Sequence, residues 1–295
     1  MIGAIVNYCT NDYRFLRLCL KEVCSFSSQV VVVVCDRFFD GSLENRELLN
    51  LSYAEHPECQ FIEFHFDPAR PYGLYCPWAP SDDDWIHYWH STARYVGFHF
   101  LREEIDTVLF VDVDEIFDGL RVRQWLDAFD YRSYDALRFS SYFYFREAKY
   151  RSTSFPLNVL LAKKSRISSP EMLLDVCERK GVFDAIAGCK MQHVRGLDDE
   201  PLVHHYSWVK PQKELLKKVA CWGHHCEKDW TALLEKEFAG PFTGVDALYG
   251  LHYEEVEPLH DPLVIYPRDM PQPPTASFSH VEKVDAAALF RKGLF

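Results

Sequence analysis

The first half of the chain alternates apolar runs with longer segments whose apolar residues recur at helical spacing. Residues 30–34 are consecutive valines, and Ile2–Tyr8 is apolar almost throughout. Runs without polar positions indicate strands buried on both faces, as in a parallel sheet covered by helices. The pattern predicts strands at Ile2–Tyr8, 30–34, 60–66 and 107–111, and helices at Tyr13–Cys24 and 88–104.

The second half of the chain is less regular. Ala136–Phe145 alternates well enough to predict a strand, and 157–162 is expected to pair with it. Pro170 marks the first turn of a further helix, and two later segments, 210–222 and 229–238, have helical spacing. The order of elements predicts an α/β fold: an open, mostly parallel, twisted sheet flanked by helices, with a C-terminal helical extension.

Four prolines between residues 266 and 277 set the end of the chain apart. They predict an extended C-terminal tail over 266–295, because proline neither continues a helix nor donates to a sheet. The chain has no internal repeat and no Gly/Ser linker. Residues 1–265 are therefore predicted to form a single domain with two halves, 1–118 and 119–265.

Charge and composition narrow the class of partner. The chain carries 32 Lys and Arg against 44 Asp and Glu, a net charge of −12, and a nucleic-acid backbone requires clustered cations. The longest apolar run, 30–35, is far shorter than the roughly 20 residues of a membrane span, and no secretory segment precedes the first strand. We therefore expect no nucleic-acid partner, no transmembrane segment, a cytoplasmic location and free cysteines.

Two carboxylates follow the last buried strand of the first half. Residues 107–111 lead directly into Asp112, Val113 and Asp114. Ligands of open α/β sheets bind at the carboxyl ends of the strands, and carboxylate oxygens suit Mg²⁺ or Mn²⁺. The pattern predicts a divalent-cation site; the alternative is that the two acids only end the strand and cap the next turn.

The first half resembles the nucleotide-sugar half of GT-A fold glycosyltransferases, in particular the family-2-like enzymes with an Asp-x-Asp motif. The resemblance covers residues 1–118: a first strand with a polar end, a second strand ending at Asp36, and the Asp-x-Asp after a later strand. Cys35 stands where the family usually has a further Asp. The resemblance implies that Asp36 accepts a hydrogen bond from the base and that Arg94 faces the nucleotide. The nucleotide-binding residues implied in this way are Thr10, Asp36, Arg94, Asp112 and Val113.

A histidine pair lies far downstream of the carboxylates, and His205 comes 91 positions after Asp114. In the similar enzymes a downstream histidine often completes the metal site, so the resemblance implies Asp112, Asp114 and His205 as ligands of Mn²⁺ or Mg²⁺. Neighbouring side chains of a strand point to opposite faces. His205 is favoured, His204 is the alternate, His193 is a third candidate, and a core role of these histidines is the other interpretation.

Two more patterns carry possible chemistry. Residues 221–226 contain two cysteines and two histidines, but no Cys-x-x-Cys pair occurs in the chain. A turn between two helices is therefore favoured over a structural zinc site. Lysines recur over 210–218, which predicts either a solvated helix face or a lysine that contacts a diphosphate.

An inverting transferase also needs a general base beside the acceptor hydroxyl. In the similar enzymes this acid commonly lies before the metal histidine at the start of a helix. Glu171 and Asp175 follow Pro170 at such a position, and Asp184 is a further candidate. The alternative is that acids are placed at a helix N-terminus by the helix dipole alone.

Taken together, the residue patterns and the family resemblance imply a metal-dependent glycosyltransferase, either a hexosyl- or a pentosyltransferase. The donor is a nucleoside diphosphate sugar, with a UDP-sugar favoured, and the acceptor is a glycan or another hydroxyl compound. A nucleotidyltransferase is the first alternative, although residues 7–14 lack the glycines of a phosphate loop. A carbohydrate-binding protein without activity is the second, on the strength of its tryptophans: Trp78, Trp85, Trp89 and Trp208.

Overall fold

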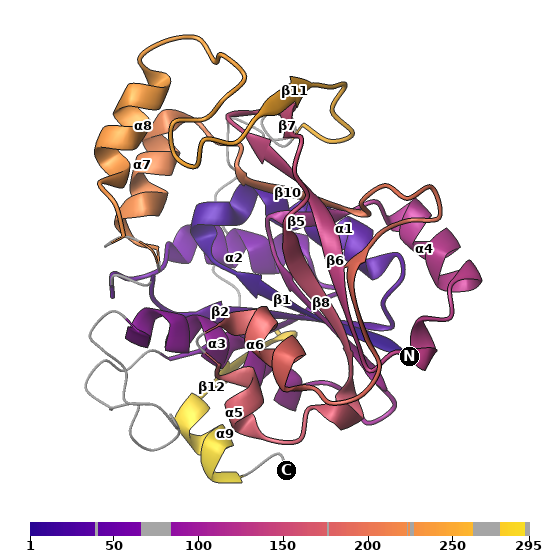
Figure 1. Cartoon of the computed structure of the whole chain (residues 1–295). Coiled ribbons are helices and arrows are strands. Elements are labelled where there is room, and N and C mark those ends of the chain that lie inside the picture. Colours follow the sequence, from indigo (N-terminus) through magenta and orange to yellow (C-terminus); the bar gives the residue numbers. More distant parts are fainter. Residues whose placement is uncertain are drawn as a thin grey trace.

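A computed structural model describes residues 1–38, 41–65, 84–175, 177–222, 224, 227–261 and 278–292. In this part of the chain, 12 strands form one open sheet with helices on both faces (Figure 1). The strand order along the main path is β11-β7-β6-β8-β4-β1-β2-β3-β12. The predicted α/β class with an open, mostly parallel sheet is confirmed.

The parallel part of the sheet is formed mainly by the first half of the chain. Its strands are β1 (Ile2–Tyr8), β2 (Gln29–Cys35), β3 (Gln60–Phe64) and β4 (Thr107–Asp112), in the order β4-β1-β2-β3. Each of these strands was predicted within two residues of its ends. Their carboxyl ends meet at one edge of the sheet, which is where a ligand site belongs in such folds.

Alternate residues of the central strands belong to two separate cores, which explains their unbroken apolar runs. Ala4 and Val32 pack with α1 (Tyr13–Cys24) and with further helices on the same face, α2 (Arg46–Glu55) and α4 (Gly119–Ala128). Ile5 and Val33 pack on the other face with α3 (Asp84–His99), α5 (Pro170–Leu173), α6 (Glu178–Ala185) and α9 (Ala286–Lys292).

Helix α2 was not predicted from the sequence. Asn45 caps it, because the side-chain oxygen of Asn45 accepts hydrogen bonds from the backbone N–H groups of Glu47 and Leu48 at 3.1 and 3.2 Å. A parallel pair such as β2 and β3 requires a crossover, which is usually helical. The parallel pairing of these strands is therefore the signal that would have indicated a helix there.

The antiparallel part of the sheet comes from the second half. Strand β8 (Leu157–Lys163) lies between β4 and β6 (Ala136–Phe145) and is antiparallel to both, so the predicted pairing of 136–145 with 157–162 is confirmed. Strand β10 (Val203–Trp208) pairs with β6 and also with the short β5 (Glu115–Phe117). The remaining strands of this part are β7 (Glu147–Ser152), β9 (Lys190–Val194) and β11 (Tyr253–Glu255).

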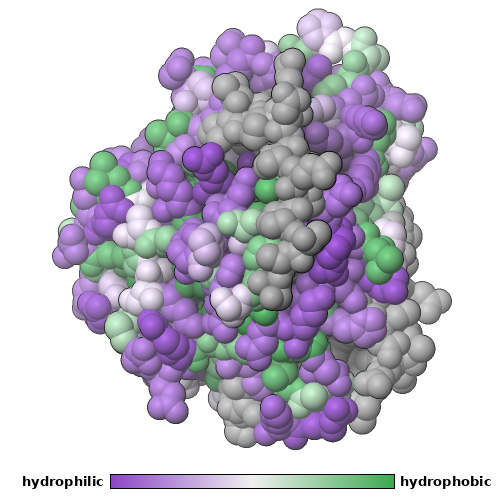
Figure 2. Space-filling model, turned by 180° about the vertical axis from the view of Figure 1, so that it is seen from behind, coloured by the Kyte–Doolittle hydropathy of each residue, from purple (hydrophilic) through white to green (hydrophobic). Residues whose placement is uncertain are grey.

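The two predicted helices of the C-terminal part form a pair beside β7 and β11 (Figure 1). Helices α7 (Gln212–Ala220) and α8 (Trp230–Phe238) share a separate core with Phe145 and Trp208. The described residues also contain the short 3-10 helices η1 (Thr10–Asp12), η3 (Tyr131–Ser133) and η4 (Lys164–Arg166). Seen from behind, the surface is mostly polar, with small hydrophobic areas between the polar ones (Figure 2).

The end of the chain differs from the predicted extended tail over 266–295. The proline-rich stretch lies outside the described residues, but 278–292 return to the sheet. Strand β12 (Val281–Val284) is parallel to β3, with Val281 opposite Phe61, and α9 packs on α3 through stacked rings of Phe290 and Tyr95, 4.1 Å apart. The prediction is therefore wrong for this segment, because its apolar residues cover the edge strand β3 and helix α3.

None of the helices in the described residues combines the length and the apolar character that a membrane crossing requires.

We expect Gly97→Ala to destabilise the protein, because α3 approaches β1 too closely for a side chain there. A Cβ at this position would lie 2.5 Å from Cγ2 of Ile5 and 2.9 Å from Cγ2 of Val33. Overpacking of a core costs about 1–3 kcal/mol, which exceeds the roughly 1 kcal/mol that alanine gains in a helix. The free energy of unfolding in urea measures the effect.

Gly240→Ala is the matched control, because an added Cβ there meets nothing within 4 Å. Equal stability of the Gly97→Ala and Gly240→Ala variants would contradict the close packing of α3 on β1.

Candidate functional site

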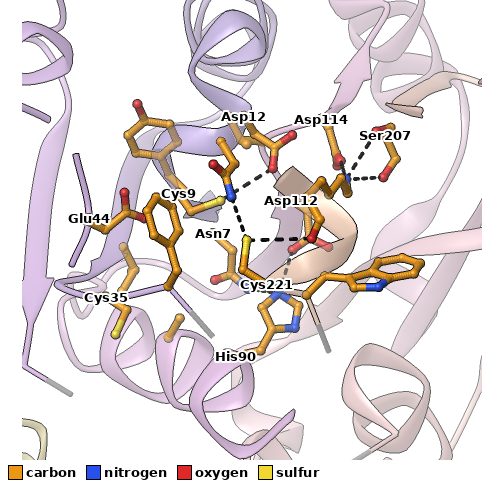
Figure 3. A pocket seen from close by; sticks show the side chains of 18 of the residues that line it. Asn7, Cys9, Asp12, Cys35, Glu44, His90, Asp112, Asp114, Ser207 and Cys221 are labelled. Carbon is orange, nitrogen blue, oxygen red and sulfur yellow. Dashed lines mark hydrogen bonds and ion pairs between the residues drawn. The ribbon is translucent and has the colours of Figure 1, made fainter. Parts of the chain in front are cut away.

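A cavity of about 280 Å³ opens at the carboxyl ends of β1, β2 and β4 (Figure 3). Helices α3 and α6 and the segment from β10 to α7 complete its wall. In Figure 3, Cys35 and Glu44 lie at one end of the cavity, and Asp114 and Ser207 lie at the other. The acidic, basic and histidine residues of the described lining are Asp12, Arg37, Glu44, His90, Asp112, Asp114, Glu178, His205, Lys218 and His224.

The two carboxylates of the Asp-x-Asp segment have different partners. Strand β4 ends at Asp112, and the backbone N–H of Val113 donates to the carbonyl of Asn7 on β1 at 3.1 Å. Oδ2 of Asp112 lies 2.8 Å from Nη2 of Arg179, and its Oδ1 lies 3.6 Å from Nε2 of His90. Burial raises the pKa of Asp112, but Arg179 and His90 outweigh burial and lower it.

Arg179 also neutralises Glu115, which sequence analysis did not single out. Glu115 is 0% exposed; its Oε2 lies 2.5 Å from Nη1 of Arg179 and accepts the backbone N–H of Asp112 at 2.8 Å. Burial raises the pKa of Glu115 to about 7 although Arg179 acts in the opposite direction. One guanidinium on α6 thus fixes both the backbone and the side chains of the segment after β4.

Asp114 contacts two cationic or titratable side chains from the second half of the chain. Its Oδ1 lies 3.5 Å from Nε2 of His205, and its Oδ2 lies 3.4 Å from Nζ of Lys218. Burial alone raises the pKa of Asp114, but Lys218 and His205 outweigh it and hold the pKa well below its usual range. Lys218 is anchored by the hydroxyl of Ser207, to which it donates at 2.6 Å.

The histidine pair is oriented as strand alternation predicts. His205 faces Asp114, and the side-chain amide of Asn158 lies 2.8 Å from its Nδ1, which fixes the ring. His204 points to the other side, where its ring stacks on Tyr144, and burial lowers its pKa to about 3. His193 lies on β9 among exposed residues, so His205 alone of the three lines the cavity.

A buried lysine lies beneath this end of the site. Lys210 is 1% exposed; it donates to the carboxylate of Asp12 and, at 3.2 Å, to the carbonyl of Asn11. This pair ties η1 to the segment after β10. Among the lysines of the 210–218 segment, Lys218 lines the cavity and Lys210 supports its wall.

The predicted nucleotide-binding residues do not all reach the cavity. The backbone N–H of Thr10 donates to Glu44 at 3.2 Å and its hydroxyl donates to the same carboxylate, so Thr10 is held behind the wall. Asp36 lies 2.6 Å from Nδ1 of His65, while Cys35 and Arg37 on either side line the cavity. Their nucleotide contacts remain predictions.

Arg94 is buried below α6. It is 1% exposed, its Nη2 donates to the hydroxyl of Ser91 at 2.8 Å, and its Nη1 lies 3.9 Å from Oε2 of Glu178. Oε1 of Glu178 lies 3.1 Å from Nδ1 of His90. Glu178 lines the cavity at the start of α6 with a φ of +53°, which is uncommon for a residue with a Cβ.

None of the three predicted general bases is among the described residues that line the cavity. Glu171 is exposed on α5, and Asp184 is exposed and paired with Lys180. Asp175 was expected on the helical face of Glu171, but α5 ends at Leu173. Asp175 lies in the turn beyond it, where its Oδ1 accepts the backbone N–H of Cys177 at 2.7 Å.

The fit of a divalent cation rests on Asp114 and His205. The described residues contain no group of three His, Cys, Asp or Glu side chains arranged around one point. Asp112 is occupied by Arg179 and His90, so the expected triad is reduced to two side chains. Mg²⁺ is often held by one or two carboxylates together with substrate phosphates and water. Asp114 fits that arrangement, and the imidazole of His205 lies beside it.

The segment 221–226, which sequence analysis weighed as a structural zinc site, is described only in part. Residues 223, 225 and 226 lie outside the described part of the chain. Cys221 lines the cavity at the end of α7, and its thiol accepts a hydrogen bond from the amide of Asn11 at 3.2 Å.

Comparison with solved structures finds matches of low identity and low TM-score. A segment of TarS from S. aureus is 13% identical with a TM-score of 0.42, covering 81% of this chain and 72% of that one. A glycosyltransferase involved in glycosylation of the major capsid of PBCV-1 is 11% identical with a TM-score of 0.36, covering 72% of this chain and 96% of that one. A 4-diphosphocytidyl-2C-methyl-D-erythritol synthase from Anaerococcus prevotii is 11% identical with a TM-score of 0.40, covering 77% of this chain and 99% of that one. No family model and no curated protein matches the chain.

We expect the stability of the protein to depend on the protonation of Glu44. Burial raises the pKa of this carboxyl from 4.5 to about 7. The folded state therefore binds more protons than the unfolded state between these values, and the free energy of unfolding falls as the pH rises from 4.5 through 7. The shift corresponds to at most roughly 3 kcal/mol.

Urea unfolding at several pH values from 4.5 to 8 measures this effect in wild type and in Glu44→Gln, which removes it. Glu47→Gln, on the exposed side of α2, is the control and keeps the wild-type slope. A Glu44→Gln variant with the wild-type slope would show that Glu44 does not titrate in this range.

Proposed function

We propose that the protein is a glycosyltransferase of GT-A-like fold that moves a sugar from a nucleoside diphosphate sugar to the hydroxyl group of a glycan or another acceptor. The observation that carries the proposal is the Asp114–His205 contact at the carboxyl edge of the parallel strands, 3.5 Å between Oδ1 and Nε2. Two sequence-distant ligands converge on a cavity in the place where open α/β sheets bind substrates.

The charge balance of the cavity supports a divalent cation in the reaction. Among its described lining residues, the carboxylates (Asp12, Glu44, Asp112, Asp114 and Glu178) outnumber the permanent cations, Arg37 and Lys218. Arg179, Lys210 and Arg94 pair with Asp112, Asp12 and Glu178 from outside the lining, so the charge of a bound diphosphate would still need a further cation. Mn²⁺ or Mg²⁺ held by Asp114 and His205 would supply that charge and offset the charge of the leaving diphosphate.

The other end of the cavity suits the base of the donor. Val33, Phe64 and Ala93 give it an apolar wall, and Arg37 and Glu44 offer a donor and a titratable acceptor. A planar base is accommodated by such a wall, and the two polar groups can meet its edge. A UDP-sugar is the donor that we favour.

Glu178 is the residue that we propose as general base, in place of Glu171, Asp175 and Asp184. It lines the cavity, and its carboxylate is near His90 and Arg94. Burial lowers the pKa of His90, but Glu178 and Asp112 outweigh burial and raise it to about 9, so the carboxylate of Glu178 faces two positive groups. The strained backbone at this residue holds the side chain at the start of α6.

The proposal is tested by melting the protein with UDP and other nucleoside diphosphates, with and without Mn²⁺. A ligand at about 100 times its Kd stabilises the folded state by roughly 2.7 kcal/mol. The product then identifies the reaction: release of UDP from a UDP-sugar supports transfer of the sugar. Release of pyrophosphate from a nucleoside triphosphate and a sugar phosphate would favour a nucleotidyltransferase instead.

Asp114→Asn is expected to abolish the Mn²⁺-dependent part of donor binding and to lower kcat strongly, because an amide is a weaker ligand of a hard cation. Titration of UDP against the variant with and without Mn²⁺ measures the loss. Asp184→Asn, a change of the same chemistry at an exposed residue, should behave as wild type. Unchanged metal dependence in the Asp114→Asn variant would refute the metal site.

Glu178→Gln is expected to lower transfer by roughly 10²–10⁴ while donor binding is retained, because a glutamine keeps the size of the side chain but cannot accept the proton. Single-turnover transfer and UDP titration separate the two effects. Glu171→Gln is the control and should keep wild-type turnover. A Glu178→Gln variant that transfers sugar normally would remove this residue from the chemistry.

A further inference from the structure

Two cysteines that are distant in the sequence meet away from the cavity. Cys24 is the last residue of α1, and Cys59 directly precedes β3. Their sulfur atoms are 3.8 Å apart, which is van der Waals contact. Formation of a bond of about 2.05 Å therefore requires only a small approach of the two side chains.

Both residues are attached to well-anchored backbone. The helix that ends at Cys24 is followed by a hydrogen bond from the backbone N–H of Ser25 to the carbonyl of Glu22 at 3.1 Å. The backbone N–H of Cys59 donates to the carbonyl of His56 at 3.2 Å, and the strand that follows is paired on both sides. The contact therefore joins a helix end to a turn that is fixed by its own hydrogen bond and by the strand that follows it.

The two thiols differ in access and in acidity, which assigns them different roles. Cys24 is exposed, whereas Cys59 is 2% exposed. A hydrogen bond from the thiol of Cys59 lowers the pKa of Cys24, so the accessible sulfur is the one that forms a thiolate more readily.

The other described cysteines have different surroundings. Cys19 is close enough to contribute to the raised pKa of Cys59, but it is fully buried. Cys9 donates to Asp12, and Cys221 is held by the amide of Asn11. Cys177 and Cys189 are exposed at separate places in the fold. Cys24 and Cys59 are therefore the pair that we expect to form an intramolecular disulfide after exchange at the surface.

We propose that Cys24 and Cys59 are a redox-active pair that forms a reversible disulfide by exchange with a small disulfide such as oxidised glutathione. The thiolate of Cys24 attacks one sulfur of glutathione disulfide and releases one glutathione thiolate. The sulfur of Cys59, after giving up its proton to solvent, attacks Cys24 in the mixed disulfide and releases the second. Two protein thiols are oxidised, and one glutathione disulfide is reduced to two molecules of glutathione.

The bond would join the end of α1 to the beginning of β3. Helix α1 follows η1, whose residues Asn11 and Asp12 line the cavity at the opposite end of that helix. A cross-link restricts the unfolded chain over the intervening residues and stabilises the folded state. We therefore expect the oxidised protein to melt a few degrees above the reduced protein.

The experiment equilibrates the whole protein with oxidised glutathione, blocks the remaining thiols by alkylation, and maps the peptides by mass spectrometry. Wild type should yield the Cys24 and Cys59 peptides cross-linked, with a mass lower by two hydrogens and without glutathione. Cys59→Ser should keep glutathione on Cys24, because the resolving thiol is absent. Cys24→Ser should form neither product at this pair.

Cys189→Ser, which removes an exposed thiol elsewhere, should form the Cys24–Cys59 cross-link as wild type does. Reduction with dithiothreitol should restore both thiols and the lower melting temperature. Wild type that retains glutathione on Cys24, or in which both thiols stay open to alkylation in excess glutathione disulfide, would overturn the proposal. These results are independent of whether the protein transfers sugar.

Discussion

Neutralisation of three carboxylates within four consecutive residues is the constraint on which this structure depends. Asp112, Asp114 and Glu115 are all withdrawn from bulk water to a large extent, and like charges this close repel strongly at low dielectric constant. Arg179 forms ion pairs with Asp112 and Glu115, and Lys218 forms one with Asp114. Loss of one partner of a buried ion pair typically costs about 3–5 kcal/mol, since the other charge remains uncompensated.

These cations tie the two halves of the chain into one site. Arg179 comes from α6, and Lys218 comes from α7, both in the second half. The pairing of β10 with β5 sets His205 opposite Glu115, and this register brings the imidazole against the neighbouring Asp114. The first half of the chain provides the carboxyl edge of the parallel strands and the three carboxylates. The second half of the chain provides the cations that pair with them.

The same arrangement explains why the two acids of the Asp-x-Asp segment are not equivalent. Asp112 pairs with Arg179 and His90, and this pairing positions the turn that follows β4. Asp114 faces His205 and a lysine that Ser207 holds in place. A cation at the proposed metal site would therefore compete with Lys218 for Asp114 and leave the pairing of Asp112 with Arg179 in place.

The sequence by itself determined the parallel half of the sheet, because unbroken runs such as 30–34 are stable only as strands covered on both faces. It also singled out Asp114, because a carboxylate after a buried strand is a local signal, whereas the family resemblance pointed to a downstream histidine and strand alternation favoured His205. Only the tertiary structure identified Arg179, Glu115 and Glu178 and distinguished Lys218 from the other lysines of 210–218. Their importance lies in charge pairs between segments more than 60 residues apart. Pairing across such separations depends on strand order and register, which no local pattern encodes. For the same reason the return of β12 to β3 was visible only in the folded chain.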